Sequence, residues 1–285
     1  MYPATFDYSA PSTIDEVLRL LREHGDNARL LAGGHSLLPL MKLRFAQPAH
    51  VVDLRRVASL RGVRREAGAL VIGAMTTYAE LATSSDVRDA APALADAASN
   101  IGDPQVRNRG TIGGSIAHAD PAADLPAVML ALDASFVAAA ANGHRTIPAA
   151  EFFVDLFTTS LATNELLTEI RVPVSRTRTG SAYAKHPHPA SRFPLVGVAA
   201  VVDLERMSDR VQRVRVAVTG LGNKPIRAIA LEEALAGKTP DADAISLAAS
   251  QIETSGTDST ANEYRAHLVR VCAEQAVRKA VERAQ

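Results

Sequence analysis

The spacing of apolar residues in the first 75 positions predicts a helix followed by short strands. In "PSTIDEVLRLLREHG" apolar positions recur three and four residues apart, and Thr13 and Glu16 have the spacing of a capping box. We expect this helix to end at Gly25, because glycine is common just past helix C-termini. Apolar runs predict strands at 28–33, 50–54 and 69–75. The order is helix, strand, a helical or irregular segment, and two further strands.

The middle of the chain alternates helical and strand-like patterns. The alanine-rich stretch 76–102 contains Thr and Ser residues suited to helix caps, and it predicts one short and one longer helix. A strand at 135–140 leads into Asn142-Gly143, a strong hairpin signal. Another strand is expected at 166–173. The polar stretch "VSRTRTGS" that follows predicts a domain boundary.

Beyond this boundary, strand patterns come first and helical patterns last. After "AYAKH", the stretches 195–205 and 211–221 predict an antiparallel pair joined near Ser208-Asp209. Helical patterns then occupy 226–236, 241–252 and 259–283. Strands followed by helices indicate a small α+β domain, here residues 175–285.

Composition and charge exclude several function classes. Thirty-one Lys and Arg balance 31 Asp and Glu, so the formal net charge is zero and no nucleic-acid surface is expected. The N-terminus "MYPATFDYSAP" lacks the basic and apolar regions of a signal peptide, and no stretch suits a membrane span, so we expect a cytoplasmic protein. The one cysteine, Cys272, cannot by itself bind zinc or an iron–sulfur cluster, and its helical context indicates a buried side chain.

Two glycine pairs interrupt the regular pattern: Gly33-Gly34 in "LLAGGHSLLPLMKLR" and Gly113-Gly114 in "NRGTIGGSIAHADPAADLP". Neither matches a P-loop or a Rossmann fingerprint. Glycine permits positive φ angles and close approach, so consecutive backbone N–H groups in such loops can bind an anion. Hydroxyl groups nearby add possible donors, namely Ser36, Thr111 and Ser115. Each pair alone is equally explained as a tight turn, but two of like chemistry at strand ends favour a pyrophosphate site.

Two aspartates follow the second glycine pair. Asp120 suits the N-cap, and Pro121 the first position, of a helix that runs through Val128. Asp124 then lies in the first turn, where a carboxylate suits the helix dipole but repels a phosphate. With a nucleotide bound, Asp124 is better placed to accept a hydrogen bond from a ribose hydroxyl. The alternative is a surface carboxylate that only stabilises the helix.

The two glycine motifs together closely resemble those of the FAD-binding medium subunits of molybdenum hydroxylases, the relatives of aerobic carbon monoxide dehydrogenase and xanthine dehydrogenase. The resemblance extends through "TEIRVP" and "HPASRFPLVGVAA" to the C-terminal region, and so covers essentially the whole chain. It implies an α+β fold. A vanillyl-alcohol-oxidase (PCMH)-type FAD-binding domain spans 1–174, with α/β subdomains at about 1–56 and 57–174. A small C-terminal domain like that of carbon monoxide dehydrogenase flavoproteins, an antiparallel sheet plus helices, spans 175–285.

The resemblance also implies which residues contact FAD. Asp124 should meet the adenosine half, while Leu167 and Lys185 should lie near the flavin. Phe193 should shield the isoalloxazine ring; some relatives have tyrosine there, and phenylalanine keeps the stacking face without the hydroxyl. The pyrophosphate should contact the two glycine loops, that is Ala32, Gly33, Gly34, His35, Ser36, Leu37, Thr111, Gly113, Gly114 and Ser115. No catalytic acid, base or metal ligand is expected in this chain.

The function implied by the resemblance is electron relay. A large molybdopterin subunit oxidises the substrate, [2Fe-2S] clusters of a small subunit pass electrons to the FAD of this chain, and an external acceptor receives them. A dimer of such heterotrimers is the expected assembly. The single cysteine agrees, because the clusters must then lie in a partner. Two alternatives are a stand-alone FAD oxidase, disfavoured by the lack of an acid–base cluster, and an assembly protein without cofactor, disfavoured by the intact glycines.

Overall fold

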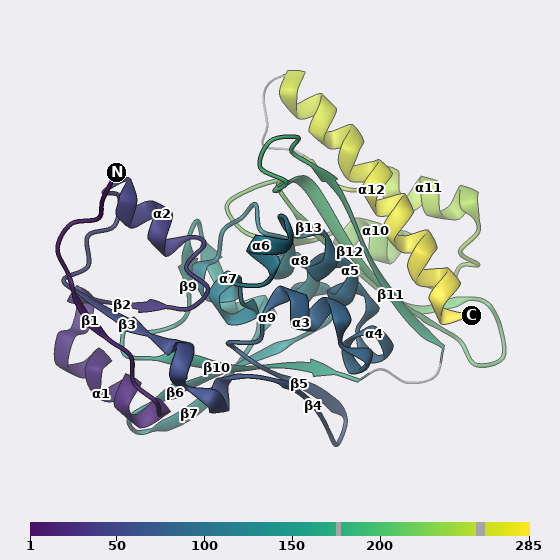
Figure 1. Cartoon of the computed structure of the whole chain (residues 1–285). Coiled ribbons are helices and arrows are strands. Elements are labelled where there is room, and N and C mark those ends of the chain that lie inside the picture. Colours follow the sequence, from purple (N-terminus) through teal and green to yellow (C-terminus); the bar gives the residue numbers. More distant parts are fainter. Residues whose placement is uncertain (175–177, 255–259) are drawn as a thin grey trace.

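The computed structural model describes residues 1–174, 178–254 and 260–285. Its first unit, at the left of Figure 1, is a three-stranded parallel sheet in the order β1 (Asp7–Ser9), β3 (His50–Asp53) and β2 (Ala28–Leu31). Two α-helices belong to this unit, α1 (Ile14–His24) and α2 (Leu37–Lys42), with the 3-10 turns η1 (Gly25–Asn27), η2 (Leu54–Arg56) and η3 (Ala58–Leu60).

The predicted capping box fixes the start of α1. Thr13 Oγ1 accepts a hydrogen bond from the Glu16 backbone N–H at 3.2 Å, and the Glu16 carboxylate accepts one from the Thr13 N–H at 3.3 Å. Gly25, with φ of 50°, ends the helix as predicted. The apolar face, including Val17 and Leu21, packs into a core with the parallel sheet.

The second unit is a five-stranded antiparallel sheet. Its strand order is β4 (Val63–Glu66), β5 (Ala69–Gly73), β10 (Leu166–Pro173), β6 (Ser135–Ala140) and β7 (Gly143–Pro148). The predicted hairpin at Asn142-Gly143 joins β6 to β7. The intervening elements are α3 (Tyr78–Thr83), α4 (Ser85–Ala90), α5 (Pro92–Asn100), α6 (Pro104–Arg107), α7 (Ile112–His118), α8 (Asp124–Ala131), α9 (Ala149–Phe152), β8 (Phe153–Asp155) and β9 (Thr158–Thr159).

The prediction of two helices in 76–102 was wrong, because three are present. The side chain of Ser84 caps a new helix by accepting from the Val87 N–H, at 3.4 Å, directly after α3 ends. Pro92 then stands in the first turn of α5, where its missing N–H costs no hydrogen bond. The local capping chemistry at Ser84 and Pro92 therefore produces three short helices in place of the two that were predicted.

The third unit is a four-stranded antiparallel sheet in the order β11 (Thr179–Pro187), β12 (Pro194–Leu204), β13 (Val211–Thr219) and β14 (Ile226–Arg227). It is followed by α10 (Ile229–Leu235), α11 (Ala242–Ser250) and α12 (Thr260–Ala284), the long yellow helix of Figure 1. The β12–β13 pair confirms the predicted hairpin. The predicted helix at 226–236 begins later, because Ile226 and Arg227 pair with β13. The predicted start at residue 259 lies outside the described residues.

The third sheet is buried on both faces. Val198 and Ala200 of β12 pack with α11 and α12, whereas the alternate residues Ala199 and Val201 join the core of the second unit. Strand residues alternate between faces, so this pattern places α5 and α8 on the opposite side of the sheet from α12. The C-terminal sheet therefore packs against α5 and α8, and α8 in turn contacts α7, the helix that carries the second glycine pair.

Candidate functional site

A cleft of about 620 Å³ opens where the three units meet. Its walls come from the segment after β2, from α7 and the start of α8, from β10, and from the connection between β11 and β12. All the candidate residues line it except Lys185, which lies behind Asp124. The fold thus brings together segments that are far apart in the sequence.

The first glycine pair forms a tight crossing between two loops. Gly34 has φ of 81°, in the left-handed region that glycine adopts without strain. At Gly33 a side chain would overlap the carbonyl of Arg109, and its Cβ would lie 2.8 Å from the Gly110 Cα. Gly33 therefore allows the loop after β2 to lie directly against the loop before α7.

The backbone after this crossing offers a set of free donors. Among the described residues, the N–H groups of Gly34, His35, Ser36 and Leu37 have no hydrogen-bond acceptor, and all four residues line the cleft. Successive N–H groups that face a concavity form an anion-binding nest. The segment can therefore hold a phosphate without a lysine.

The second glycine pair differs from the prediction, because it lies in the first turn of α7 and not at a strand end. Thr111 is the N-cap, and its Oγ1 accepts from the Gly114 N–H at 3.2 Å. The Gly113 N–H donates to the Ala74 carbonyl at 2.8 Å, and a side chain at Gly113 would overlap Ala74. Gly113 thus permits close helix packing, and these amides are already used within the protein.

Gly114 has a different role from Gly113. A Cβ there would lie 2.8 Å from Thr111 Oγ1 and 3.4 Å from the Cβ of Ala32 in the first loop. Its bare backbone therefore keeps the gap between the two loops open. Ser115, one residue further on, also lines the cleft, as does Tyr78, whose pKa is raised by burial to about 12.

The expected helix start at Asp120 was wrong. The Asp120 carboxylate accepts from the Ala122 N–H at 2.9 Å and its carbonyl accepts from the Ala123 N–H, which forms a separate turn. The helix begins at Asp124 and continues to Ala131. Pro126 lies in its first turn, where a missing N–H is tolerated.

Asp124 is the most deeply buried charge in the cleft wall, at 5% exposure. Its Oδ1 accepts from the Tyr183 hydroxyl at 2.9 Å and from Lys185 Nζ at 2.9 Å. Burial raises the pKa of the Asp124 carboxyl, while the ammonium group of Lys185 and the Tyr183 hydroxyl oppose that rise. Because Lys185 balances the charge directly, Asp124 acts as a hydrogen-bond acceptor at the edge of the cleft.

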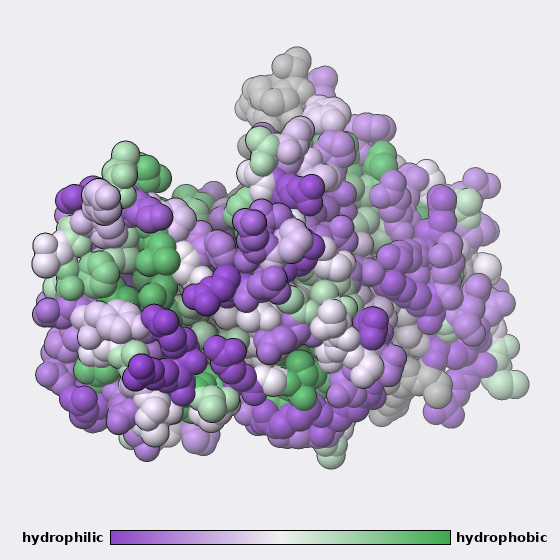
Figure 2. All heavy atoms as spheres, viewed as in Figure 1, coloured by the Kyte–Doolittle hydropathy of each residue, from purple (hydrophilic) through white to green (hydrophobic). Residues whose placement is uncertain are grey.

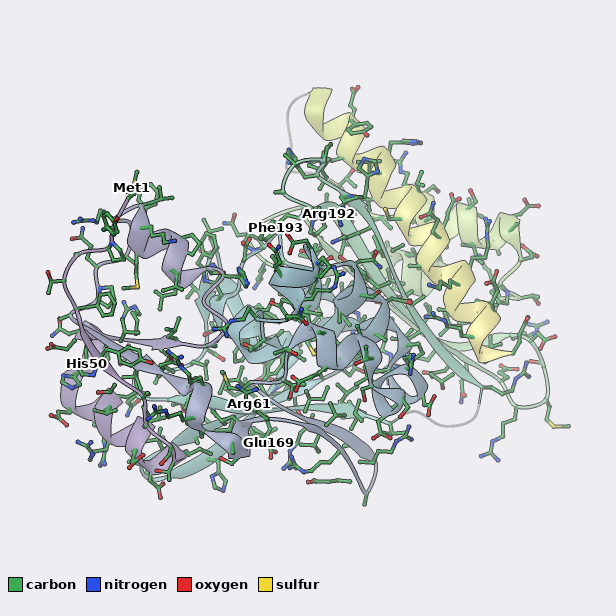
Figure 3. The ribbon with its side chains drawn as sticks, in the orientation of Figure 1. Met1, His50, Arg61, Glu169, Arg192 and Phe193 are labelled. Carbon is green, nitrogen blue, oxygen red and sulfur yellow. The ribbon has the colours of Figure 1, made fainter. Side chains whose placement is uncertain are left out.

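Phe193 lies on the connection between β11 and β12, and its side chain is 48% exposed. Figure 3 shows it beside Arg192, whose carbonyl accepts from Lys185 Nζ at 3.0 Å. Leu167, 4% exposed, lies at a register shift in β10 on another wall of the cleft. Phe193 therefore gives the cleft an exposed aromatic ring, and Leu167 gives it a buried apolar side chain.

Two features of the cleft were missed by the sequence analysis. Tyr183 precedes Lys185 by two residues, so strand alternation places both on one face, and this spacing was available in the sequence. His118 and Phe157 have ring centroids 5.0 Å apart and both line the cleft. Burial lowers the pKa of His118. Phe157 lies on the β8–β9 hairpin, which no motif connects with the glycine loops.

No cluster of three or more His, Cys, Asp or Glu side chains suited to a metal ion occurs in the described ranges. Cys272 is buried in α12, as predicted, and burial raises the pKa of its thiol to about 11. A buried thiol of this kind does not serve as a metal ligand or a nucleophile. None of the described helices is long and apolar enough to cross a membrane.

Two protein families match the chain. Residues 4–175 match the FAD-binding domain of molybdopterin dehydrogenases, and residues 181–280 match the C-terminal domain of carbon monoxide dehydrogenase flavoproteins. The chain is 45% identical over 249 residues to the carbon monoxide dehydrogenase medium chain of Hydrogenophaga pseudoflava, covering 87% of this chain and 86% of that one. It is 38% identical to the 6-hydroxypseudooxynicotine dehydrogenase complex subunit alpha of Paenarthrobacter nicotinovorans, over 100% and 97% of the two chains.

Solved structures agree with these matches. A carbon monoxide dehydrogenase from Hydrogenophaga pseudoflava that lacks the Mo-pyranopterin moiety superposes with a TM-score of 0.92 at 42% identity, over 99% of both chains. Quinoline 2-oxidoreductase from Pseudomonas putida 86 superposes with a TM-score of 0.91 at 30% identity, over 100% of this chain and 99% of that one. This chain therefore belongs to the FAD-binding medium subunits of the molybdenum hydroxylases, with a PCMH-type FAD-binding domain and a flavoprotein C-terminal domain.

Proposed function

We propose that the chain binds FAD in the cleft described above and relays electrons from a partner's iron–sulfur clusters to an external acceptor. The observation that best supports this proposal is the run of free N–H groups from Gly34 to Leu37, in residues that line the cleft beside the start of α7. These donors suit the negative charge of a pyrophosphate. When bound, FAD supplies the redox chemistry, and this chain supplies position and electrostatics.

The two loops contribute unequally to this proposed pyrophosphate site. Residues 34–37 supply backbone donors, whereas Thr111 and Ser115 supply hydroxyl groups and Gly114 supplies open space. The fit is supported by the cradle itself, since a side chain at Gly114 would enter the gap between the loops. We therefore propose that both glycine motifs border the pyrophosphate, and that the backbone N–H donors come mainly from the first motif.

The remaining candidates border other parts of the cleft, except Lys185, which lies behind Asp124. Both donors to Asp124 bond to Oδ1, so Oδ2 keeps lone pairs for a ribose hydroxyl of the adenosine half. Leu167 and Lys185 are proposed to lie near the flavin, and Phe193 to stack on it, because its exposed ring borders the cleft. We also propose that the FAD-binding domain spans residues 1–174 and the C-terminal domain residues 175–285.

We propose a large molybdopterin subunit and a small [2Fe-2S] subunit as partners, assembled as a dimer of heterotrimers. Support comes from the names of the relatives, which are chains or subunits of larger enzymes. Exposed apolar side chains also gather around α2 and the chain start, toward the upper left of Figure 2, and such patches mark protein contacts. They are Met1, Leu38, Leu43 and Phe45.

The relay is tested by following flavin absorbance in the purified chain, alone and with the proposed molybdenum and iron–sulfur partner subunits. We expect bound oxidised FAD that stays oxidised with candidate substrates until both partners are present. Reduction of the isolated chain by a small alcohol would instead indicate a stand-alone oxidase. A folded chain that takes up no FAD would indicate an assembly protein.

The cytoplasmic location expected from the N-terminal sequence stays a prediction. Fractionation of cells that produce the full-length protein tests it directly. Recovery of the flavoprotein with cytoplasmic markers is the expected result, and recovery with membrane or exported fractions would contradict it.

A further inference from the structure

Tyr183 lies at the centre of a buried polar network that joins the C-terminal sheet to the cleft wall. Tyr183 and Lys185 point to the same side of β11, and both donate to Asp124 Oδ1 at 2.9 Å. Tyr183 is 5% exposed, as is Asp124, and the Lys185 side chain is 7% exposed. In such surroundings each hydrogen bond fixes the geometry strongly, because water cannot replace it.

The network continues to the segment that carries Phe193. Lys185 Nζ donates to the Arg192 carbonyl at 3.0 Å, in addition to its bond to Asp124. A displacement of the Asp124 carboxylate therefore moves the ammonium group, and with it the attachment of the residue directly before Phe193. The Tyr183 hydroxyl therefore influences two walls of the cleft, the one that contains Asp124 and the one that contains Phe193.

Gly197 makes room for this hydroxyl. Gly197 pairs with Lys185 in the β11–β12 register, and a Cβ at Gly197 would overlap the Tyr183 hydroxyl. The same Cβ would lie 2.9 Å from the Thr219 side chain, whose hydroxyl donates to the carbonyls of Pro121 and Ala123 at the start of α8. The space around Tyr183 is therefore bounded on all these sides, and only glycine fits at 197.

We propose that Tyr183 is a positioning residue for FAD. Its hydroxyl holds Asp124 and Lys185 in place, and Gly197 leaves the room that this hydroxyl needs. The inference rests on the proposed FAD site, since its effect is exerted through residues of that cleft. Tyr183 itself does not line the cleft, so it works through its two partners.

The test compares FAD affinity and the visible spectrum of bound flavin in the full-length chain and its variants. Tyr183→Phe removes the hydroxyl but keeps the ring, and Gly197→Ala keeps the tyrosine but displaces its hydroxyl. We expect each to bind FAD about ten-fold more weakly, the usual effect of losing a hydrogen bond to a charged group, with an altered spectrum at saturation. Tyr2→Phe, on an 85% exposed tyrosine, is the matched control and should leave both unchanged.

A second comparison separates positioning from a general loss of stability. In an Asp124→Ala background, Tyr183→Phe should weaken FAD binding much less than in the wild type, because the carboxylate that accepts the hydrogen bond from Tyr183 is gone. A folded Tyr183→Phe protein with wild-type affinity and spectrum would overturn the inference, as would an equal effect in both backgrounds. If the wild-type chain itself binds no FAD, the proposed function fails and this inference fails with it.

Discussion

Asp124 is a carboxylate buried at the edge of the cleft, and one lysine balances its charge. Lys185 Nζ lies 2.9 Å from Oδ1, and the two side chains are 7% and 5% exposed. Burial raises the pKa of Asp124, and the ammonium group limits the rise. Such a pair adds little net stability by itself, but loss of one partner leaves a buried charge without compensation.

This balance predicts an asymmetric response to substitution. Lys185→Met should lower the free energy of unfolding of the FAD-free chain by about 3–5 kcal/mol, because Asp124 loses its counter-charge. Asp124→Asn combined with Lys185→Met should recover much of that loss, since the amide still accepts from Tyr183 and carries no charge. Urea denaturation of the three proteins measures both effects. A neutral Lys185→Met variant would show that Asp124 does not need this lysine.

Glycines that look equivalent in the sequence have distinct roles in the structure. Gly33 lets two loops cross, Gly113 lets α7 pack on Ala74, and Gly114 keeps the gap between the loops open. The motif alone predicts a close backbone approach at each pair. It does not say what approaches, and in all three cases the nearest atoms belong to this chain itself.

Among the elements of the first unit, α1 and β3 are joined through two stacked histidines. The rings of His24 and His50 have centroids 4.0 Å apart at an interplanar angle of 15°, and His50 Nε2 lies 2.9 Å from Ser9 Oγ on β1. Burial lowers the pKa of His50 below its usual 6.5, and the nearby charge of His24 lowers it further, while Asp7 and Glu23 oppose the shift.

The lowered pKa of His50 predicts a loss of stability in mild acid. Unfolded chains take up the proton near pH 6.5, whereas the folded protein does so only at lower pH. Below about pH 6.5 the unfolded state therefore binds more protons, and stability falls as pH drops through the folded pKa. Melting temperatures measured at about pH 7 and about pH 5.5 should differ less in His50→Gln than in the wild type. Equal pH dependence in both proteins would contradict the assignment.

Local signals predicted the elements that depend on local chemistry. The capping box at Thr13 and the hairpin at Asn142-Gly143 were correct, because both are fixed by residues a few positions apart. The start of α8 was wrong, since the Asp120 carboxylate closes its own turn before the helix begins. The free amides after Gly33 and the bond between Tyr183 and Asp124 depend on contacts across the fold, so a single sequence does not specify them.

In the molecule as a whole, the cleft depends on how the C-terminal sheet is attached. Asp133, in the turn after α8, forms ion pairs with three arginines of β13 and β14, at 2.7, 2.8 and 3.5 Å for Arg213, Arg215 and Arg227. Gly180 lacks a side chain where the α12 backbone comes close. These contacts attach the C-terminal sheet to the turn after α8 and to α12, at the end of β11 and β12 opposite the connection that carries Phe193.

The central claim is that FAD occupies this cleft between the two glycine loops. Its most direct test is the stoichiometry of FAD bound by the folded full-length chain, measured by titration for the wild type, Gly114→Val and Gly222→Val. Gly222 is the matched control, because a Cβ there meets nothing within 4 Å. We predict one FAD per chain for the wild type and Gly222→Val, and none retained by Gly114→Val, whose side chain fills the gap. A folded Gly114→Val protein that binds FAD as the wild type does would contradict the account.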